Sequence, residues 1–495
     1  MRTYKAIVAN SPRIISQLEN ITPVVNQCDA CSPIIFVKNE LIQDQISGVP
    51  FLKYQKLIEQ AVNSNHYAVL SPLSKSFSVL NKKAMQILEY FRTPNFFDDI
   101  PSAWIETWGN ELIEYTFRRM ILNGLLISNK YSSPIFSEVV EKLTAWLHIT
   151  DRCNLRCAYC YLPHKSVDMS EERGRAAIDA TYRSAIINNY KEVKFKYSGG
   201  EPLLRIGLIK DLHRYAHSLA DQHKIHLDGI ILSNGTLLST EIIKTMQSLD
   251  LRLMISLDEL EEYHDLQRFY QNGRGATDVA KLSIDLALQN GLIPDISITV
   301  TGRNSNRLSE LTNWLLERDL PFTFNFYREN KFSSCHSDLR LEEETIVSGM
   351  LDAYKMIETN LPRRSLLTSL VDQSNLFAPH LRTCSVGHSY LVFNHLGQVS
   401  KCQMQISKPV TTTNVKDPLS FIRADKSGIQ NLSVEEKEDC HSCDWKYWCA
   451  GGCPLVTFRE TGRYDVKSPN CNIYKILYPE VMRLEGLRLL KYASN

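Results

Sequence analysis

The chain has 495 residues, of which 43% are hydrophobic and 22% are charged, and its formal net charge is +1. This length exceeds what one hydrophobic core usually supports, so about two to four domains are expected. The nearly neutral charge gives no general case for a nucleic acid or membrane partner, and no apolar run approaches the roughly 18–20 residues of a membrane span. The start of the chain also lacks the apolar core of a signal peptide, which predicts a cytoplasmic protein.

The chain contains 13 cysteines. In a reducing cytoplasm, cysteines that cluster hold metal more often than they form disulfides. The first two, Cys28 and Cys31, have the CxxC spacing of a redox pair or of half a metal site. No second pair stands nearby, so plain thiols are the favoured interpretation. They lie in residues 1–65, a region whose fold the sequence leaves unclear.

Residues 66–129 carry the pattern of a small winged-helix domain. Two short apolar strands are expected at 67–70 and 77–80, with a turn between them, and a helix follows the second strand. A second helix is expected over 110–123, before a short apolar strand at 125–127. A hairpin, helices and a final strand together form one compact unit.

This arrangement resembles the PqqD-like recognition element of enzymes that modify ribosomally synthesised peptides. The resemblance implies that residues 66–129 bind the leader of a precursor peptide by adding it as a strand to a sheet edge. A generic winged-helix spacer is the alternative. DNA binding is less favoured because this stretch has no marked basic helix.

A polar linker over residues 130–142 leads into a region where strand and helix patterns alternate. Strands are expected at 143–150, 193–198, 229–233, 252–257, 296–301 and 322–327. Helices are expected near 171–189, 206–222, 240–249, 276–290 and 307–318. Six strands that alternate with helices predict an α/β fold with a parallel sheet, whose active residues stand at the carboxyl ends of the strands.

Cys153, Cys157 and Cys160 directly follow the first of these strands. Because the three thiols are so closely spaced, they must face a common point on one loop. Thiolates favour iron–sulfur clusters, zinc or copper(I), and three ligands leave a position open where a closed structural site takes four. The run resembles the CxxxCxΦC signature of the radical S-adenosylmethionine (SAM) superfamily, with Tyr159 at the aromatic position. A zinc knuckle or buried free thiols is the alternative.

The resemblance implies a partial (β/α)6 barrel over residues 143–330 and a [4Fe–4S] cluster whose fourth iron is chelated by SAM. Motifs similar to those of the superfamily follow the next strands: a GGEP turn, an SNG turn, and an SLD motif with a downstream HDxxR. They imply a set of SAM-contacting residues: Tyr159, Gly199, Gly200, Glu201, Asn234, Ser256 and Arg268. Glu201 offers acceptors for an ammonium group, and the fork of Arg268 suits a carboxylate. Asp258 and His264 have either a functional or a loop-fixing role, and Glu259 replaces the usual glycine.

Seven further cysteines lie near the C-terminus with the spacings C-x12-G-x4-C, C-x2-C-x5-C-x3-C and C-x17-C, and Gly397 is the interior glycine. This arrangement resembles the seven-cysteine motif of SPASM domains and implies two auxiliary [4Fe–4S] clusters. The first would be held by Cys384, Cys402 and Cys453, and the second by Cys440, Cys443, Cys449 and Cys471. Zinc bound by the same thiolates is the alternative.

Two positions depart from the pattern of sulfatase maturases. Where those enzymes have a fourth cysteine for the first auxiliary cluster, this chain has Ala378. Either Cys335 supplies the ligand or one iron stays open. Where they place a general-base aspartate, this chain has Gln403, whose amide cannot accept a proton at neutral pH. Tyr327 and Arg328, near the end of the sixth strand, are guesses at substrate-facing residues.

The favoured function is a radical SAM/SPASM maturase that installs an oxidative crosslink, C–C or thioether or ether, in a precursor peptide. The expected partners are that peptide and an electron donor such as flavodoxin or ferredoxin. Residues 331–380 would form a helical connection and residues 381–495 the SPASM domain. The alternatives are formylglycine formation on a sulfatase, peptide splicing, a non-peptide substrate, or a non-catalytic protein that binds peptides or carries electrons.

Overall fold

The computed structural model describes residues 11–16, 34–37, 46–128 and 136–492. Cys28 and Cys31 lie outside the described residues. No helix among the described residues is long and apolar enough to cross a membrane.

A nine-stranded, mostly parallel sheet forms the centre of the molecule, in the order β15-β14-β13-β12-β11-β10-β16-β17-β18. Its first six strands run parallel: β10 (Lys142–Thr150), β11 (Glu192–Gly199), β12 (His226–Ser233), β13 (Arg252–Ser256), β14 (Asp295–Val300) and β15 (Phe322–Phe326). From its second residue onward β10 is buried throughout, as expected for a strand covered on both faces. The predicted α/β class and the six parallel strands are confirmed.

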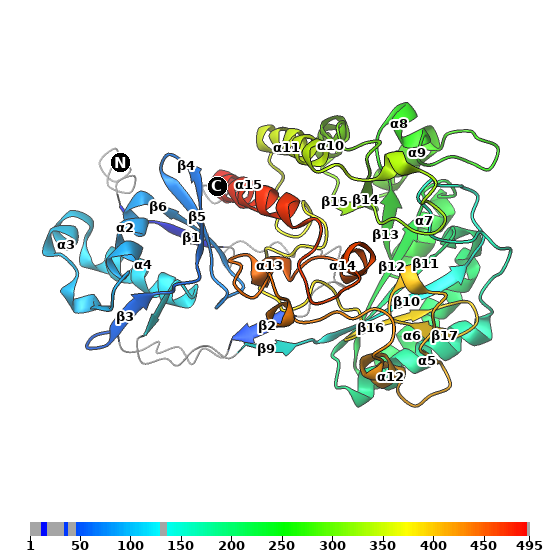
Figure 1. The fold of residues 1–495 in the computed structure, drawn as a ribbon, viewed down its shortest axis with the longest axis horizontal. Coiled ribbons are helices and arrows are strands. Elements are labelled where there is room, and N and C mark those ends of the chain that lie inside the picture. The colour runs from blue at the N-terminus through cyan, green and yellow to red at the C-terminus, as the bar shows by residue number, and fades with distance from the viewer. Residues whose placement is uncertain (1–10, 17–33, 38–45, 129–135, 493–495) are drawn as a thin grey trace.

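Helices alternate with these strands along the chain and cover the sheet (Figure 1). They are α5 (Glu171–Ile187), α6 (Ile206–His223), α7 (Thr240–Ser248), α8 (Glu261–Asp265), α9 (Thr277–Gln289) and α10 (Leu308–Glu317). Ser170 and Ser239 cap α5 and α7 with side-chain oxygens that accept backbone N–H bonds. These caps explain why the helices begin where they do.

The C-terminal region joins this sheet directly. The strand β16 (Tyr390–Phe393) pairs parallel with β10, and β17 (Gln398–Ser400) and β18 (Thr411–Thr412) continue the sheet in antiparallel order. The remaining elements are α11 (Glu343–Thr359), α12 (Pro418–Ala424), α13 (Lys446–Cys449), α14 (Pro454–Thr461) and α15 (Cys471–Tyr492). The region that carries the last seven cysteines is therefore attached to the strand that precedes the first cysteine loop.

The N-terminal part forms a separate lobe (Figure 1). One sheet has the order β1-β6-β5-β4 and a smaller one the order β7-β3-β8. The strands are β1 (Ile14–Ser16), β3 (Pro50–Lys53), β4 (Ile58–Asn63), β5 (His66–Leu70), β6 (Phe77–Asn81), β7 (Asn95–Phe96) and β8 (Leu126–Ser128). The helices are α2 (Lys82–Tyr90), α3 (Ser102–Trp108) and α4 (Asn110–Leu122), and β2 (Ile34–Val37) pairs with β9 (Phe136–Val139).

The expected boundary at residue 66 cuts through this lobe. The strands β4 and β5 form a hairpin across it, with Ile58 opposite Leu70, and β1 pairs with β6 from the other side. The correction has a physical reason, because an isolated two-stranded hairpin is marginally stable and needs further strands and a covered face. Residues well before 66 therefore belong to the same folding unit.

The C-terminal helix α15 connects the two lobes. It packs on the β4 strand so closely that a Cβ at Gly486 would lie 2.4 Å from a methyl carbon of Val62. Its buried Glu485 accepts hydrogen bonds from the Ser365 hydroxyl at 3.0 Å and the Leu366 N–H at 2.9 Å, on the barrel side. Arg488 neutralises that carboxylate at 2.7 Å. The N-terminal lobe is thus tied to the barrel.

Candidate functional site

The loop after β10 brings the first three cysteines to the carboxyl end of the barrel. Its backbone is held by the segment after α8: the Arg156 N–H donates to the Phe269 carbonyl at 2.7 Å, and the Ala158 N–H to the Gln267 carbonyl at 2.9 Å. The Leu155 N–H points at the Cys153 sulfur at 3.3 Å. The loop is thereby held in one conformation by main-chain bonds.

Side chains from two other strand ends reach the same sulfurs. The Asn234 amide nitrogen lies 3.8 Å from the Cys153 sulfur, and a guanidinium nitrogen of Arg268 lies 3.9 Å from the Cys157 sulfur. Burial raises the pKa of Cys153 to about 11 and that of Cys157 to about 12. The free thiols therefore stay protonated at neutral pH, whereas binding to a metal would deprotonate them.

The turn after β11 lies against this loop. A Cβ at Gly199 would be 2.4 Å from the Thr150 carbonyl oxygen, and one at Gly200 would be 2.2 Å from the Arg152 carbonyl oxygen. The Gly200 and Glu201 N–H groups donate to those same two carbonyls at 2.7 and 2.8 Å. Glycine is required at both positions because the two backbones approach so closely.

Glu201 is fully buried beneath the turn and accepts three hydrogen bonds from the chain itself. The donors are the Leu203 N–H at 2.9 Å, the Ser233 hydroxyl at 2.8 Å and the Asn234 N–H at 2.7 Å. Burial raises its pKa to about 7. The carboxylate therefore ties the ends of β11 and β12 together, a role that its place in the motif did not reveal.

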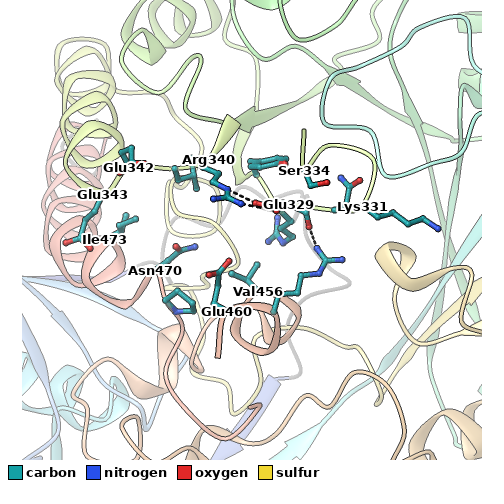
Figure 2. A pocket seen from close by; sticks show the side chains of 16 residues that line it. Glu329, Lys331, Ser334, Arg340, Glu342, Glu343, Val456, Glu460, Asn470 and Ile473 are labelled. Atoms are coloured by element: carbon teal, nitrogen blue, oxygen red, sulfur yellow. Dashed lines mark hydrogen bonds and ion pairs between the residues drawn. The ribbon is translucent and has the colours of Figure 1, made fainter. Parts of the chain in front are cut away.

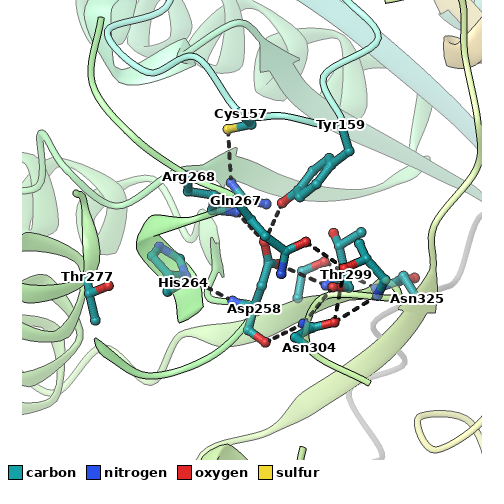
Figure 3. A network of polar contacts seen from close by, with 12 residues as sticks. Cys157, Tyr159, Asp258, His264, Gln267, Arg268, Thr277, Thr299, Asn304 and Asn325 are labelled. Atoms are coloured by element: carbon teal, nitrogen blue, oxygen red, sulfur yellow. Dashed lines mark hydrogen bonds and ion pairs between the residues drawn. The ribbon is translucent and has the colours of Figure 1, made fainter. Parts of the chain in front are cut away.

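A buried polar network surrounds Asp258 at the end of β13 (Figure 3). Its carboxylate accepts from the Tyr159 hydroxyl at 2.5 Å, from Nε of Arg268 at 2.8 Å and from the Thr299 N–H at 2.9 Å. Its own N–H donates to Nδ1 of His264 at 3.2 Å. Asp258 thus fixes two of the residues expected to contact SAM, and His264 fixes Asp258.

The other expected SAM contacts lie around the same carboxyl ends. Ser256 ends β13 and is half-buried. Asn234 follows β12, and its side-chain oxygen accepts from the Thr236 N–H at 2.9 Å. The adjacent Glu259, at the usual glycine position, is buried, and its pKa is raised to about 8, mainly by burial. The structure therefore gathers the predicted residues at one end of the sheet.

Cys384 and Cys402 belong to one buried cluster with Trp146 of β10, and the partly buried Cys453 packs against it. The Asn431 amide nitrogen lies 3.6 Å from the Cys384 sulfur. Burial raises the pKa of Cys384 to about 12, and the neighbouring Cys453 and Cys402 add to the shift. Three thiols that are far apart in the sequence are thus close enough to interact.

Arg328 reaches this group from the end of β15. Its Nε lies 3.4 Å from the Cys453 sulfur, and one terminal nitrogen binds both oxygens of Asp372 at 3.0 and 2.9 Å. Its other terminal nitrogen donates to the Phe326 carbonyl at 2.7 Å. The guanidinium is therefore a fixed cation at the first group of C-terminal cysteines rather than a free substrate ligand.

The remaining four cysteines line a small cavity of their own. They are Cys440, Cys443, Cys449 and Cys471. The aromatic residues Tyr474 and Tyr478 of α15 form part of its wall. Burial raises the pKa of Cys440 to about 12, and the thiol of Cys449 adds to the shift. The chemistry of this wall suits a group that takes four thiolates.

Cys335 and Ala378 are the two positions that bear on a fourth ligand for the first C-terminal group. Cys335 is exposed, and its thiol points to the Phe332 carbonyl at 3.9 Å. Ala378 is buried and has no thiol to offer. Tyr161, next to Cys160, is a residue that the sequence analysis missed. Burial raises its pKa, and Cys160 and Cys402 add to the shift.

A larger cavity of about 760 Å³ lies beside the end of β15 (Figure 2). Tyr327 and Arg328 at the end of β15 line it, together with residues around α11, α14 and the start of α15. Its wall carries both charge signs, for example the ion pair of Arg340 with Glu329 at 2.7 Å. Arg328 thus separates this cavity from the Cys453 sulfur.

Within the described ranges, no three His, Cys, Asp or Glu side chains come together closely enough to hold a single metal ion. In an iron–sulfur cluster each thiolate binds a different iron, so its ligands stand farther apart than around one ion. The thiol ligands, with N–H donors directed at several of the sulfurs, have the donor chemistry that such clusters need.

Comparison with known proteins places the barrel in a family. A model of the radical SAM superfamily matches residues 147–315. An uncharacterised protein of Methanocaldococcus jannaschii is 30% identical over 222 residues, which cover 44% of this chain and 74% of that protein. The chain belongs to the radical SAM superfamily, and this membership implies a [4Fe–4S] cluster and SAM.

Two further similarities extend beyond the barrel. A serine-type anaerobic sulfatase-maturating enzyme of Klebsiella aerogenes is 22% identical over 320 residues, which cover 61% of this chain and 77% of that enzyme. The structure of native anSMEcpe with AdoMet and the Cp18Cys peptide bound covers 72% of this chain and 99% of its own, with a TM-score of 0.56 and 16% identity. The protein is thus a radical SAM enzyme that is similar in sequence to a sulfatase-maturating enzyme and in fold to the anSMEcpe structure.

Proposed function

We propose that this protein is a radical SAM/SPASM maturase that installs an oxidative crosslink in a ribosomally synthesised precursor peptide. The observation that carries the proposal is the separation of ten cysteines into three groups. One lies on the loop after β10, one is a buried cluster beside Trp146, and one lines its own cavity. A radical generator with electron acceptors nearby needs such an arrangement.

Cys153, Cys157 and Cys160 would hold the SAM-binding cluster, and the GGEP turn, Asn234, Ser256, Tyr159 and Arg268 would contact SAM. When bound, the cluster and SAM supply a 5′-deoxyadenosyl radical that removes a hydrogen atom from an unactivated carbon. The chain positions this chemistry through Asp258, which holds Tyr159 and Arg268 in place.

Cys384, Cys402 and Cys453 would hold a first auxiliary [4Fe–4S] cluster with one open iron. Cys440, Cys443, Cys449 and Cys471 would hold the second. These clusters would accept the electron that is left over when the crosslink forms. The initial electron would come from a donor such as flavodoxin or ferredoxin in the cytoplasm.

The N-terminal lobe would bind the precursor leader as a PqqD-like recognition element. Its larger sheet ends in β4 on one side and in the three-residue strand β1 on the other. An extended peptide can lengthen such a sheet through main-chain hydrogen bonds. Because α15 ties this lobe to the barrel, a leader bound there would place the following core peptide near the catalytic end.

Formylglycine formation on a sulfatase is the second candidate, and the Klebsiella relative is the observation that favours it. Against it, Gln403 stands where the resemblance implies a general base, and its side-chain oxygen accepts from the Tyr390 hydroxyl at 3.1 Å. A crosslink needs a second side chain to trap the substrate radical, after which the adduct gives one electron to an auxiliary cluster and one proton to solvent. We therefore favour crosslinking, with a C–C bond ahead of a thioether or ether.

The test is anaerobic reconstitution followed by SAM cleavage with and without a candidate precursor peptide. Three clusters predict about twelve irons per chain. The peptide should increase 5′-deoxyadenosine formation and lose two hydrogens, which mass spectrometry detects. Four or fewer irons would reject the auxiliary clusters, and a product that is epimerised or carries formylglycine would reject the crosslink.

A further inference from the structure

Lys437 is a buried cation whose surroundings differ from those of other lysines nearby. Only 1% of its surface is exposed, and its Nζ donates to the Ala450 carbonyl at 2.8 Å. A Cβ at Gly451 would lie 2.5 Å from that Nζ, so the glycine leaves the space that the ammonium occupies. Across the described part of the chain, no carboxylate forms an ion pair with it.

Two other buried lysines of the same region do have carboxylate partners. Lys401 pairs with Asp425 at 2.7 Å, and Lys446 pairs with Glu435 at 2.9 Å. A buried ammonium is costly unless an anion or several hydrogen bonds compensate for the lost water. Lys437 must therefore find its compensation elsewhere.

The backbone around Lys437 connects the two C-terminal cysteine groups. The Ala450 carbonyl that accepts from Lys437 also accepts from the Thr383 hydroxyl at 3.0 Å. Ala450 follows Cys449 of the second group, and Thr383 precedes Cys384 of the first. The ammonium thus lies where the two groups meet.

Electrostatics agree with this placement. Burial lowers the pKa of Lys437, and cysteines of both groups oppose that shift through the charge that they carry when ionised: Cys440 and Cys449 of the second, and Cys384 and Cys453 of the first. Thiols bound to a metal are deprotonated, so they would carry the negative charge that this cation lacks. Both groups would then share one counter-ion.

We propose that Lys437 is the shared counter-ion of the two auxiliary cluster sites and sets how readily each accepts an electron. The inference rests on the proposed function, because it needs auxiliary clusters. Reduction adds one electron to a cluster and forms or breaks no bond. A fixed positive charge nearby stabilises the added negative charge, so Lys437 acts as a positioning residue that favours the reduced state of both sites.

The experiment uses the full chain with Cys153, Cys157 and Cys160 all replaced by alanine, so that the remaining signals come from the auxiliary sites. Dithionite titration followed by electron paramagnetic resonance gives the reduction potential of each site. Lys437→Met keeps most of the side-chain volume and removes the charge, and Lys437→Gln is a second neutral variant. Lys426→Met is the control, because Lys426 belongs to the same region but its side chain is exposed, so water screens its charge.

Both Lys437 variants should shift the one-electron equilibrium of both sites toward the oxidised form by about tenfold, which corresponds to about 59 mV. The control should shift it less than threefold. Iron loss from both sites in both Lys437 variants, but not in the control, would also support the proposal. Unchanged potentials with iron retained, or a shift at one site alone, would overturn it.

The iron content of the parent triple variant tests the proposed function separately from the role of Lys437. If the parent triple variant itself binds far fewer than the about eight irons of two clusters, the auxiliary clusters are rejected and this inference is rejected with them. If the parent binds both clusters and the potentials ignore Lys437, the maturase proposal stands and only the counter-ion role is lost.

Discussion

The cysteine loop after β10 and the C-terminal cysteine groups are built in opposite ways. Cys153, Cys157 and Cys160 lie within one short loop, whereas the other seven cysteines are spread from Cys384 to Cys471. The loop is held by main-chain bonds to neighbouring strand ends. The C-terminal groups form only when distant segments pack together. Damage to the first site should therefore stay local, and damage to the others should spread.

The charged residues around the cysteine groups also differ, because some are paired with a carboxylate and one is not. Arg268 and Arg328 each reach a cysteine sulfur, and each is paired with a buried aspartate, Asp258 and Asp372. At the junction of the C-terminal groups, Lys437 has no such partner among the described residues. A fixed ion pair orients a side chain with little net charge, while a single cation changes the local potential. The first arrangement suits ligand placement and the second suits electron storage.

Replacing one cysteine of each kind is the strongest test of this contrast. Cys157→Ala should abolish SAM cleavage, lower the iron content by about four, and leave about eight irons in the auxiliary sites. Cys443→Ala should remove the second auxiliary cluster, lower the iron of the first auxiliary site as well, and stop peptide modification, while SAM cleavage without peptide persists. Iron content and 5′-deoxyadenosine measure both effects.

Exposed Cys335 provides the control, since Cys335→Ala should change neither quantity. Loss of all iron in Cys157→Ala would contradict a locally built loop. Loss of auxiliary iron in Cys335→Ala would instead make Cys335 the missing fourth ligand of the first auxiliary cluster.

The backbone contact beside the loop offers a second test. Gly200→Ala places a Cβ 2.2 Å from the Arg152 carbonyl oxygen, and backbone on both sides must move. SAM cleavage should fall at least about a hundredfold, because misplacement by about 1 Å costs that much. Auxiliary iron should be retained.

Gly207→Ala in α6 is the matched control, because nothing lies within 4 Å of its added Cβ. There alanine should support full activity and stabilise the helix by about 0.5–1 kcal/mol. Equal activity of the two variants would mean that the close approach at Gly200 does not matter for SAM.

The two arginine–aspartate pairs can be separated by Asp258→Asn and Asp372→Asn. Each leaves a buried guanidinium without its carboxylate, which typically costs about 3–5 kcal/mol of stability. Only Asp258→Asn should weaken SAM binding, because Asp258 also holds Tyr159. Urea unfolding and SAM titration measure the two effects, and weaker SAM binding in Asp372→Asn would contradict the separation.

The sequence predicts those parts of the fold and of the candidate site that depend on short, local residue patterns. The α/β class and the order of six strands followed from alternating patterns, and the motif residues fall at the strand ends because parallel strands share one edge. The pairing of β16 with β10 could not be predicted, since four apolar residues do not specify a distant partner. Lys437 stands among Glu435, Glu436 and Glu438 and has the pattern of a solvated segment. Its burial arises only from tertiary packing.

The acid beneath the GGEP turn gives the smallest expected effect and tests the SAM contact itself. Burial raises the pKa of Glu201 to about 7, above its ordinary value of 4.5, so the folded state holds the proton more tightly than the unfolded state. This stabilisation is complete below pH 4.5 and is lost as the pH rises to about 7, by up to about 3 kcal/mol. Thermal unfolding across this range should show the slope. The slope should disappear in Glu201→Gln and persist in Glu172→Gln, where the carboxylate is exposed.

If Glu201 faces the SAM amine, saturating SAM should flatten the slope, because a nearby ammonium favours the ionised carboxylate. A slope that SAM leaves unchanged would confine Glu201 to tying β11 to β12.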